Sequence, residues 1–170
     1  MKIAGVKIEG RNLEIIPIPR GNGQPIIFKA EAIESYDEFD KMVKRPMPPA
    51  VLKAGAKEKT YKWHDQAYIK EEEAYQKKRM SWMCIESLKA TDKLEWEKVD
   101  YRNPDTWDLW EEELKESGFS IFEITRIRTG VFTANCLNDA IIDAARESFV
   151  RGMAESKGST SGPSIEQPST

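Results

Sequence analysis

Residues 103–135, NPDTWDLWEEELKESGFSIFEITRIRTGVFTAN, contain the densest run of helix start and stop signals in the chain. Asn103 and Pro104 predict a helix start, because asparagine caps free backbone amides and proline lacks the amide that a first turn leaves unbonded. Asp105 and Asp108 place negative charge near the positive end of that helix. Its apolar residues recur at helical spacing and are Trp107, Leu109 or Trp110, and Leu114.

The same stretch predicts a sharp corner between two helices. Gly118 follows the first helix at the position where a left-handed backbone is favoured. Ser120 and Glu123 then form an S-x-x-E capping box, and Phe119 and Ile124 flank it as a hydrophobic staple. The sequence therefore fixes the angle between the two helices. We expect replacement of Gly118 by a β-branched residue to be the most damaging single change in this stretch.

Composition favours a single folded unit without membrane or secretion signals. The chain has 170 residues, of which 32% are charged. No apolar run approaches the roughly 20 residues of a membrane span, and residues 1–10 lack the apolar segment of a signal peptide, so we expect a cytosolic protein. Cys84 and Cys136 lie far apart on apolar helical faces, which predicts buried free thiols rather than a disulfide.

Charge is unevenly distributed along the chain. Residues 1–93 carry a net positive charge, whereas residues 94–152 carry a net negative charge. The acidic part would repel a phosphate backbone, and neither part is charged strongly enough to indicate nucleic-acid binding. This polarity is compatible with head-to-tail self-association or with a partner of complementary charge.

The first 34 residues predict an antiparallel β-meander of about three strands. Runs rich in β-branched residues alternate there with turn residues. Pro17 would remove a ladder donor, so its strand is expected at a sheet edge or at a bulge. Residues 21–23, Gly-Asn-Gly, favour a hairpin loop over a phosphate loop, because no complete phosphate-binding fingerprint accompanies them.

Residues 35–60 predict a short helix followed by a proline-rich linker. The helix is expected from about Ser35 to Val43, before a segment, RPMPP at 45–49, that suits neither a regular helix nor a central strand. A preformed polyproline segment could serve as an SH3-type ligand. Because the spacing gives no clean PxxP motif with a well-placed basic residue, a semi-rigid linker across the domain surface is the favoured interpretation.

Residues 61–152 predict a helical domain, which makes the chain α+β with four to five helices. The longest helix is expected from about Asp65 to Ala90. Its aromatic and methionine side chains are the candidate partner-binding residues: Tyr68, Tyr75, Met80, Trp82 and Met83. Such a stripe usually packs in a core, and recognition of a hydrophobic partner segment is the alternative.

The C-terminal part of the chain predicts two further helices and a tail. The second helix of the corner is expected to end at Asn135, and a last helix is expected from about Leu137 to Arg151, with Gly152 as its stop. Residues 153–170 consist largely of polar residues, glycine and proline, so a disordered tail is expected.

The sequence shows no recognisable catalytic, cofactor-binding or metal-binding constellation. His64 is the only histidine, and no nucleophile or further ligand is marked at a matching position. The runs Glu71–Glu73 and Glu111–Glu113 fan out around a helix, so they indicate solvated faces rather than paired carboxylates. We therefore expect an interaction protein with no enzymatic activity and no cofactor.

Short motifs spread over most of residues 1–152 give a further indication of function. The motifs are Lys2 to Gly10, Pro46 to Pro49, Trp82 to Leu88, Leu94 to Asp100, Asn103 to Trp107, Glu113-Leu114, Gly118 to Ser120, Ala134 to Asn138 and Ala145 to Phe149. Together they resemble a group of small proteins from the tail-morphogenesis region of tailed bacteriophages. Proteins of this kind are commonly regarded as tail assembly chaperones.

The resemblance implies a protein that coats the long, apolar, helical tape-measure protein in the host cytoplasm, or binds tail tube subunits, and leaves when the tail tube forms. Such a chaperone needs exposed methionine or aromatic surface and weak self-association, and no nucleic acid or membrane is implied. The N-terminal β-meander departs from a purely helical chaperone and could add strands to a neighbouring subunit. A structural component of the virion tail or neck is therefore the alternative.

Overall fold

A computed structural model of the chain describes residues 1–3, 5–7, 9–21, 23–52, 59–136 and 139–158, and at 6, 141 and 152–158 it describes only the backbone. The chain divides into two compact units, Met1–Asn135 and Cys136–Thr170. This boundary differs from the sequence-based division, which placed the last helix and the corner helices in one folded unit.

The strands form three separate antiparallel pairs. The pairs are β1 (Lys2–Ile3) with β2 (Val6–Lys7), β3 (Leu13–Ile18) with β4 (Ile26–Glu31), and β5 (Ala50–Val51) with β6 (Thr60–Tyr61). The α+β class is confirmed, but the N-terminal strands do not form one meander. The Asn12 side chain donates hydrogen bonds to the carbonyls of Thr133 and Ala134. These bonds hold the start of β3 against the end of the helix that contains Thr133 and Ala134. A meander would instead need β3 to turn back there and pair with β2.

Strand β3 lies at the edge of its pair. Lys29 of β4 donates its N–H to the Thr91 hydroxyl and accepts from it through its C=O, so its backbone polar groups point away from β3. Ladder positions alternate, and Pro17 lies opposite Ile27, two positions from Lys29. The backbone nitrogen and carbonyl of Pro17 therefore also point away from β4. The predicted edge position of this proline is confirmed, and it removes no bond from the pair.

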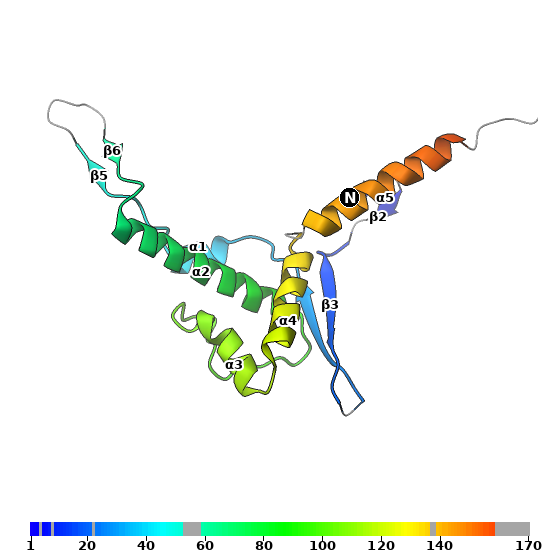
Figure 1. The fold of residues 1–170 in the computed structure, drawn as a ribbon, viewed down its shortest axis with the longest axis horizontal. Coiled ribbons are helices and arrows are strands. Elements are labelled where there is room, and N and C mark those ends of the chain that lie inside the picture. The colour runs from blue at the N-terminus through cyan, green and yellow to red at the C-terminus, as the bar shows by residue number, and fades with distance from the viewer. Residues whose placement is uncertain (4, 8, 22, 53–58, 137–138, 159–170) are drawn as a thin grey trace, which may run out of the picture. The chain divides into compact units, whose positions relative to one another are not determined.

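The helices follow the predicted order with shifted ends (Figure 1). They are α1 (Asp37–Met42), α2 (Gln66–Leu88), a 3-10 turn η1 (Trp107–Leu109), α3 (Trp110–Glu116), α4 (Ile121–Ala134) and α5 (Asp139–Gly158). The long helix is confirmed as α2, and it begins where the Asp65 carboxylate accepts hydrogen bonds from the amides of Ala67 and Tyr68. Helix α4 ends at Asn135, as predicted.

The corner between α3 and α4 has the predicted stop signal. Gly118 adopts a φ of +88°. The amides of Gly118 and Phe119 donate to the carbonyls of Lys115 and Leu114, which is the Schellman arrangement. The left-handed glycine thus satisfies carbonyls that the end of α3 would leave unbonded.

The start of α4 is capped as the sequence predicts. Ser120 and Glu123 form a complete capping box, in which each side chain accepts a hydrogen bond from the backbone amide of the other residue. Phe119, expected as one half of a staple, meets the ring of Phe28 edge-on with centroids 5.5 Å apart. The corner is therefore anchored to strand β4 as well as to its own caps.

The predicted helix start at Asn103 and Pro104 is wrong. The Asn103 side chain accepts a hydrogen bond from the amide two residues later, in a local turn. The Thr106 hydroxyl contacts the carbonyls of Asp100 and Asn103 and accepts from the amide of Asp100. These bonds close residues 100–106 into a loop, so helical structure begins only at Trp107.

Glu113 is buried, although the sequence placed it in a solvated acidic run. Its carboxylate oxygens accept hydrogen bonds from the amides of Glu97 and Lys98 at 2.5 and 2.9 Å. The irregular segment 94–99 is thereby held against α3. Its neighbour Glu112 is exposed, as predicted.

The core of the first unit contains an aromatic cluster. Phe39 of α1 lies with its ring centroid 5.4 Å from Tyr75, 6.0 Å from Trp82 and 5.9 Å from Trp107. Edge-on and tilted contacts of this kind stabilise a core beyond the area that they bury. The cluster joins α1, α2 and η1 into one body.

Helix α4 packs closely on strand β3. A Cβ atom added to Gly130 would stand 2.3 Å from Cδ1 and 2.4 Å from Cγ1 of Ile16. Glycine is therefore required by the close approach of the helix to the strand rather than by its own backbone conformation.

Part of the predicted linker is ordered. Strands β5 and β6 close it into a hairpin, and the amide of Lys62 donates to the carbonyl of Pro49 at 2.9 Å. Residues 53–58, which belong to the expected linker, lie outside the described residues, as does Asn22 of the expected hairpin loop.

The second unit departs from the prediction at the C-terminal end of its helix. Helix α5 continues through the expected stop at Gly152 to Gly158, because one glycine costs a helix only about 1 kcal/mol. Residues 153–158 of the expected tail are thus helical, while 159–170 and the expected start at Leu137 lie outside the described residues. In the described part of the chain, no helix is both long and apolar enough to cross a bilayer.

The two cysteines have different environments. Cys84 is a buried free thiol, as predicted, but Cys136 is exposed. The reason is that Cys136 lies in the turn after α4 with a φ of +55°, and not on an apolar helical face.

Candidate functional site

Most of the candidate partner-binding residues lie in the core. Tyr68, Tyr75, Trp82 and Met83 are buried, and Met80 is 44% exposed. Helix α2 is contacted by β4, η1 and α4, and Tyr75, Trp82 and Met83 are buried in the core that these elements share. Tyr75, Trp82 and Met83 therefore belong to the core, whereas Met80 is exposed and Tyr68 lies outside the core cluster.

Exposed aromatic side chains lie instead at the N-terminal end of α2. Tyr61 and Trp63 have ring centroids 6.2 Å apart, and Trp63 meets Tyr68 edge-on at 6.0 Å. Trp63 is 60% exposed. We call these three residues, of which Tyr68 is buried, the aromatic surface; they connect the β5–β6 hairpin to the helix.

A groove of about 610 Å³ lies at the aromatic surface and is lined by residues 61–67. Its size falls in the range of ligand sites, and most of its wall consists of aromatic rings and short side chains. His64 is part of this wall, but no described nucleophile or carboxylate pair accompanies it there. The rings of Tyr61 and Trp63 give the groove an apolar wall that an apolar side chain could contact.

Local bonds explain why the aromatic side chains are held in place. The amide of Asp65 donates to the carbonyl of Lys62, and the carboxylate of Asp65 caps α2. Strand β6 therefore passes into the helix through a short fixed turn that carries Trp63. Two aromatic residues at alternate positions before a helix cap were the sequence signal for this surface.

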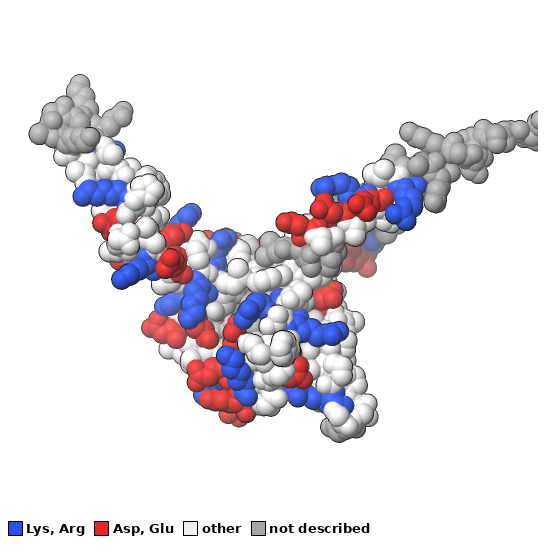
Figure 2. All heavy atoms as spheres, in the orientation of Figure 1, with Lys and Arg blue, Asp and Glu red and all other residues white. Residues whose placement is uncertain are grey.

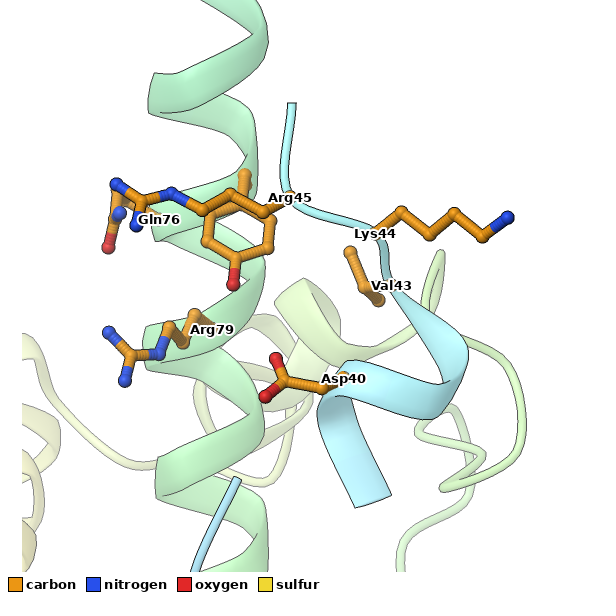
Figure 3. Close-up of a pocket in the computed structure, with 7 residues that line it drawn as sticks. Asp40, Val43, Lys44, Arg45, Gln76 and Arg79 are labelled. Carbon is orange, nitrogen blue, oxygen red and sulfur yellow. The ribbon is translucent and has the colours of Figure 1, made fainter. Parts of the chain in front are cut away.

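A second hollow, of about 550 Å³, lies between α1 and α2 and is charged (Figure 3). Arg45 pairs with Glu72 at 3.3 Å, and the Arg79 guanidinium stacks over the ring of Tyr36 at 3.9 Å. Lys44 extends away from the hollow (Figure 3). Both arginines therefore already have partners within the protein.

The buried thiol of Cys84 is poorly suited to act as a nucleophile. Burial raises its pKa to about 12, so it is protonated at neutral pH, and a protonated thiol reacts poorly. It lines a hollow of about 420 Å³ together with Met80. Asp108 in that hollow accepts from the Ser81 hydroxyl at 2.8 Å and pairs with Lys77 at 2.9 Å, so its carboxylate is satisfied locally.

Comparisons with family models, curated proteins and solved structures find no match to this chain. Within the described ranges, no group of three or more His, Cys, Asp or Glu side chains is arranged to hold a metal ion. The exposed aromatic surface is therefore the strongest candidate site in the described part of the protein.

Proposed function

We propose that this protein is a phage tail assembly chaperone, which binds the tape-measure protein, tail tube subunits or both in the host cytoplasm during tail morphogenesis. It acts without catalysis and without a cofactor. The aromatic surface is the observation that carries the proposal, together with the motif resemblance to proteins of the tail-morphogenesis region.

The physical chemistry of the aromatic surface supports this role. Tryptophan and tyrosine present large, stiff contact areas and dominate the binding energy of protein interfaces. An apolar face of a tape-measure helix would bury Trp63 and Tyr61 as it docks along the groove. Binding through a few exposed rings is also readily reversible, as a chaperone that leaves the finished tail requires.

The alternative is a structural component of the tail or neck, and the edge strand β3 favours it. An unpaired strand edge can join neighbouring subunits into a continuous sheet. A permanent component would use that edge in the virion, whereas a chaperone would use it only transiently.

Binding of tape-measure fragments to variants tests the chaperone proposal. Trp63→Ala removes the most exposed ring of the aromatic surface, and we expect the dissociation constant to rise by about tenfold or more. Phe149→Ala is the matched control, because Phe149 is an aromatic residue on α5 with a similar exposure of 68%. Isothermal titration calorimetry measures both. Unchanged binding by the Trp63 variant would contradict the role of this surface.

A further inference from the structure

The outer edge of strand β3 is unpaired among the described residues. Lys29 and Ile27 of β4 lie opposite Ile15 and Pro17. The N–H and C=O of Lys29 bond to Thr91 and not to β3. At every second residue pair of this ladder, therefore, the backbone groups of both strands point away from the partner strand. The backbone groups of Leu13, Ile15 and Pro17 therefore point outwards from the pair. No described hydrogen bond reaches them.

This edge is self-complementary. If two β3 strands meet antiparallel about a two-fold axis at Ile15, each Ile15 N–H reaches the Ile15 carbonyl of the other copy. Each Leu13 N–H then reaches the Pro17 carbonyl of the other copy. The missing Pro17 amide leaves only the Leu13 carbonyl without a donor, at the end of the paired segment.

The side chains along the edge also suit such a pairing. On the outer face, Ile15 would lie opposite Ile15 and Leu13 opposite Pro17, so no like charges meet. Ile15 is 57% exposed and Leu13 is exposed as well. Figure 2 shows that the rim formed by β3 carries mainly uncharged atoms. Natural edge strands are usually protected by charges, and this one lacks them at Leu13, Ile15 and Pro17.

The position of α4 leaves room for a second copy. The helix contacts both β3 and β4, and a helix about 10 Å wide covers roughly two strands at a spacing near 4.8 Å. A second pair would therefore place its own α4 about 10 Å away, side by side with the first. Beside the free edge lies a groove of about 450 Å³, lined by Phe122 among others. Phe122 is 83% exposed, and the second α4 would cover it.

We propose that β3 pairs with β3 of a second copy of this chain, which makes a four-stranded antiparallel sheet with two α4 helices on one face. This homodimer goes beyond the chaperone function, because its surface is separate from the aromatic surface. The hydrogen-bonding pattern, the apolar side chains and the helix spacing are all compatible with two copies related by a two-fold axis at Ile15.

Sedimentation equilibrium of the full chain tests the dimer. We expect the wild-type protein to show a reversible monomer–dimer equilibrium, and Ile15→Lys to raise its dissociation constant by about tenfold or more, because two lysines would meet at the axis. Ile27→Lys is the control: Ile27 is 41% exposed on β4, away from the axis. We expect it to change the constant by less than about twofold.

Amide hydrogen exchange of the wild-type protein provides a test that needs no variant. The amides of Leu13 and Ile15 should become protected as the protein concentration rises. A protein that remains monomeric, an Ile15→Lys dimer as tight as the wild-type dimer, or a dimer in which these amides exchange freely would each overturn the proposal. Protection that appears only when a tape-measure fragment is added to a monomer would assign the edge to another partner and would overturn it too.

Discussion

Two adjacent carboxylates on α3 show how strongly a single helical position determines the role of a residue. Glu113 is buried and accepts hydrogen bonds from two backbone amides, whereas Glu112 is exposed and reaches only the Lys98 ammonium at 3.4 Å. One position along a helix turns a side chain by about a quarter of a turn. The partners of Glu113 lie 16 and 15 residues away, so the acidic run by itself gives no sign of the difference.

Replacement of Glu113 by glutamine should lower the free energy of unfolding by about 1–3 kcal/mol, because the amide group would face a backbone donor that has lost its acceptor. Glu112→Gln, the matched control, should change it by less than about 0.5 kcal/mol. Urea denaturation followed by circular dichroism measures both values. Equal effects of the two substitutions would show that the buried carboxylate does not anchor segment 94–99.

The capping box predicts a pH dependence of stability. Hydrogen bonds from the backbone and side chain of Ser120 lower the pKa of Glu123 below its ordinary value of 4.5. The folded state therefore holds the ionised form more strongly than the unfolded state, and this contribution is complete above the ordinary pKa and disappears as the pH falls through the lowered one.

Denaturation of wild-type protein and Glu123→Gln across this pH range measures the effect. The stability advantage of the wild type should be constant near neutral pH and should shrink below about pH 4.5. Ser120→Ala, which removes the hydroxyl of the same box, should weaken this pH dependence. An advantage that stays the same down to strongly acidic pH would contradict the cap.

At the scale of the elements, the packing of α4 on β3 depends on Gly130. Gly130→Ala should destabilise the protein by about 1–3 kcal/mol, because the new methyl group overlaps Ile16 and forces the helix and strand apart. The loss in the double variant Gly130→Ala/Ile16→Ala should be smaller than the sum of the single losses. Gly21→Ala is the control, since nothing lies within 4 Å of its added Cβ. Additive losses in the denaturation series would contradict the close contact.

Gly118 presents the opposite case at the α3–α4 corner. Nothing lies within 4 Å of an added Cβ there, but the φ of +88° strains any other residue. The expected damage from a β-branched residue at this position is thus a backbone effect, and it stays a prediction. The need for Gly118 can be predicted from the neighbouring helix signals, whereas the need for Gly130 cannot, because it arises from contact with the distant Ile16.

At the scale of the whole molecule, the features that sequence predicts are those carried by neighbouring residues. The capped corner, the long helix α2 and the edge position of Pro17 follow from caps, spacing and proline chemistry within a few residues. The burial of Glu113 and the need for Gly130 arise from contacts between distant segments, which local patterns do not encode. The loop at residues 100–106 was missed because the Thr106 hydroxyl competes with a helix start.

The candidate site was only partly predictable for the same reason. The period-seven aromatic residues of α2 show that one side of the helix is apolar, but they do not show whether core or partner covers it. The structure places Tyr75 and Trp82 in the core. Tyr61 and Trp63 stand at alternate positions before the Asp65 cap, but so short a pattern does not show whether the rings are exposed; their exposure follows from the hairpin that holds them at the start of α2.

Mass spectrometry of purified virions tests the chaperone function most directly. A protein that binds the tape-measure protein during assembly and then leaves should co-purify with tape-measure fragments from infected cells and be absent from finished particles. Its presence in virions at stoichiometric copy number would contradict the chaperone function and establish the structural alternative.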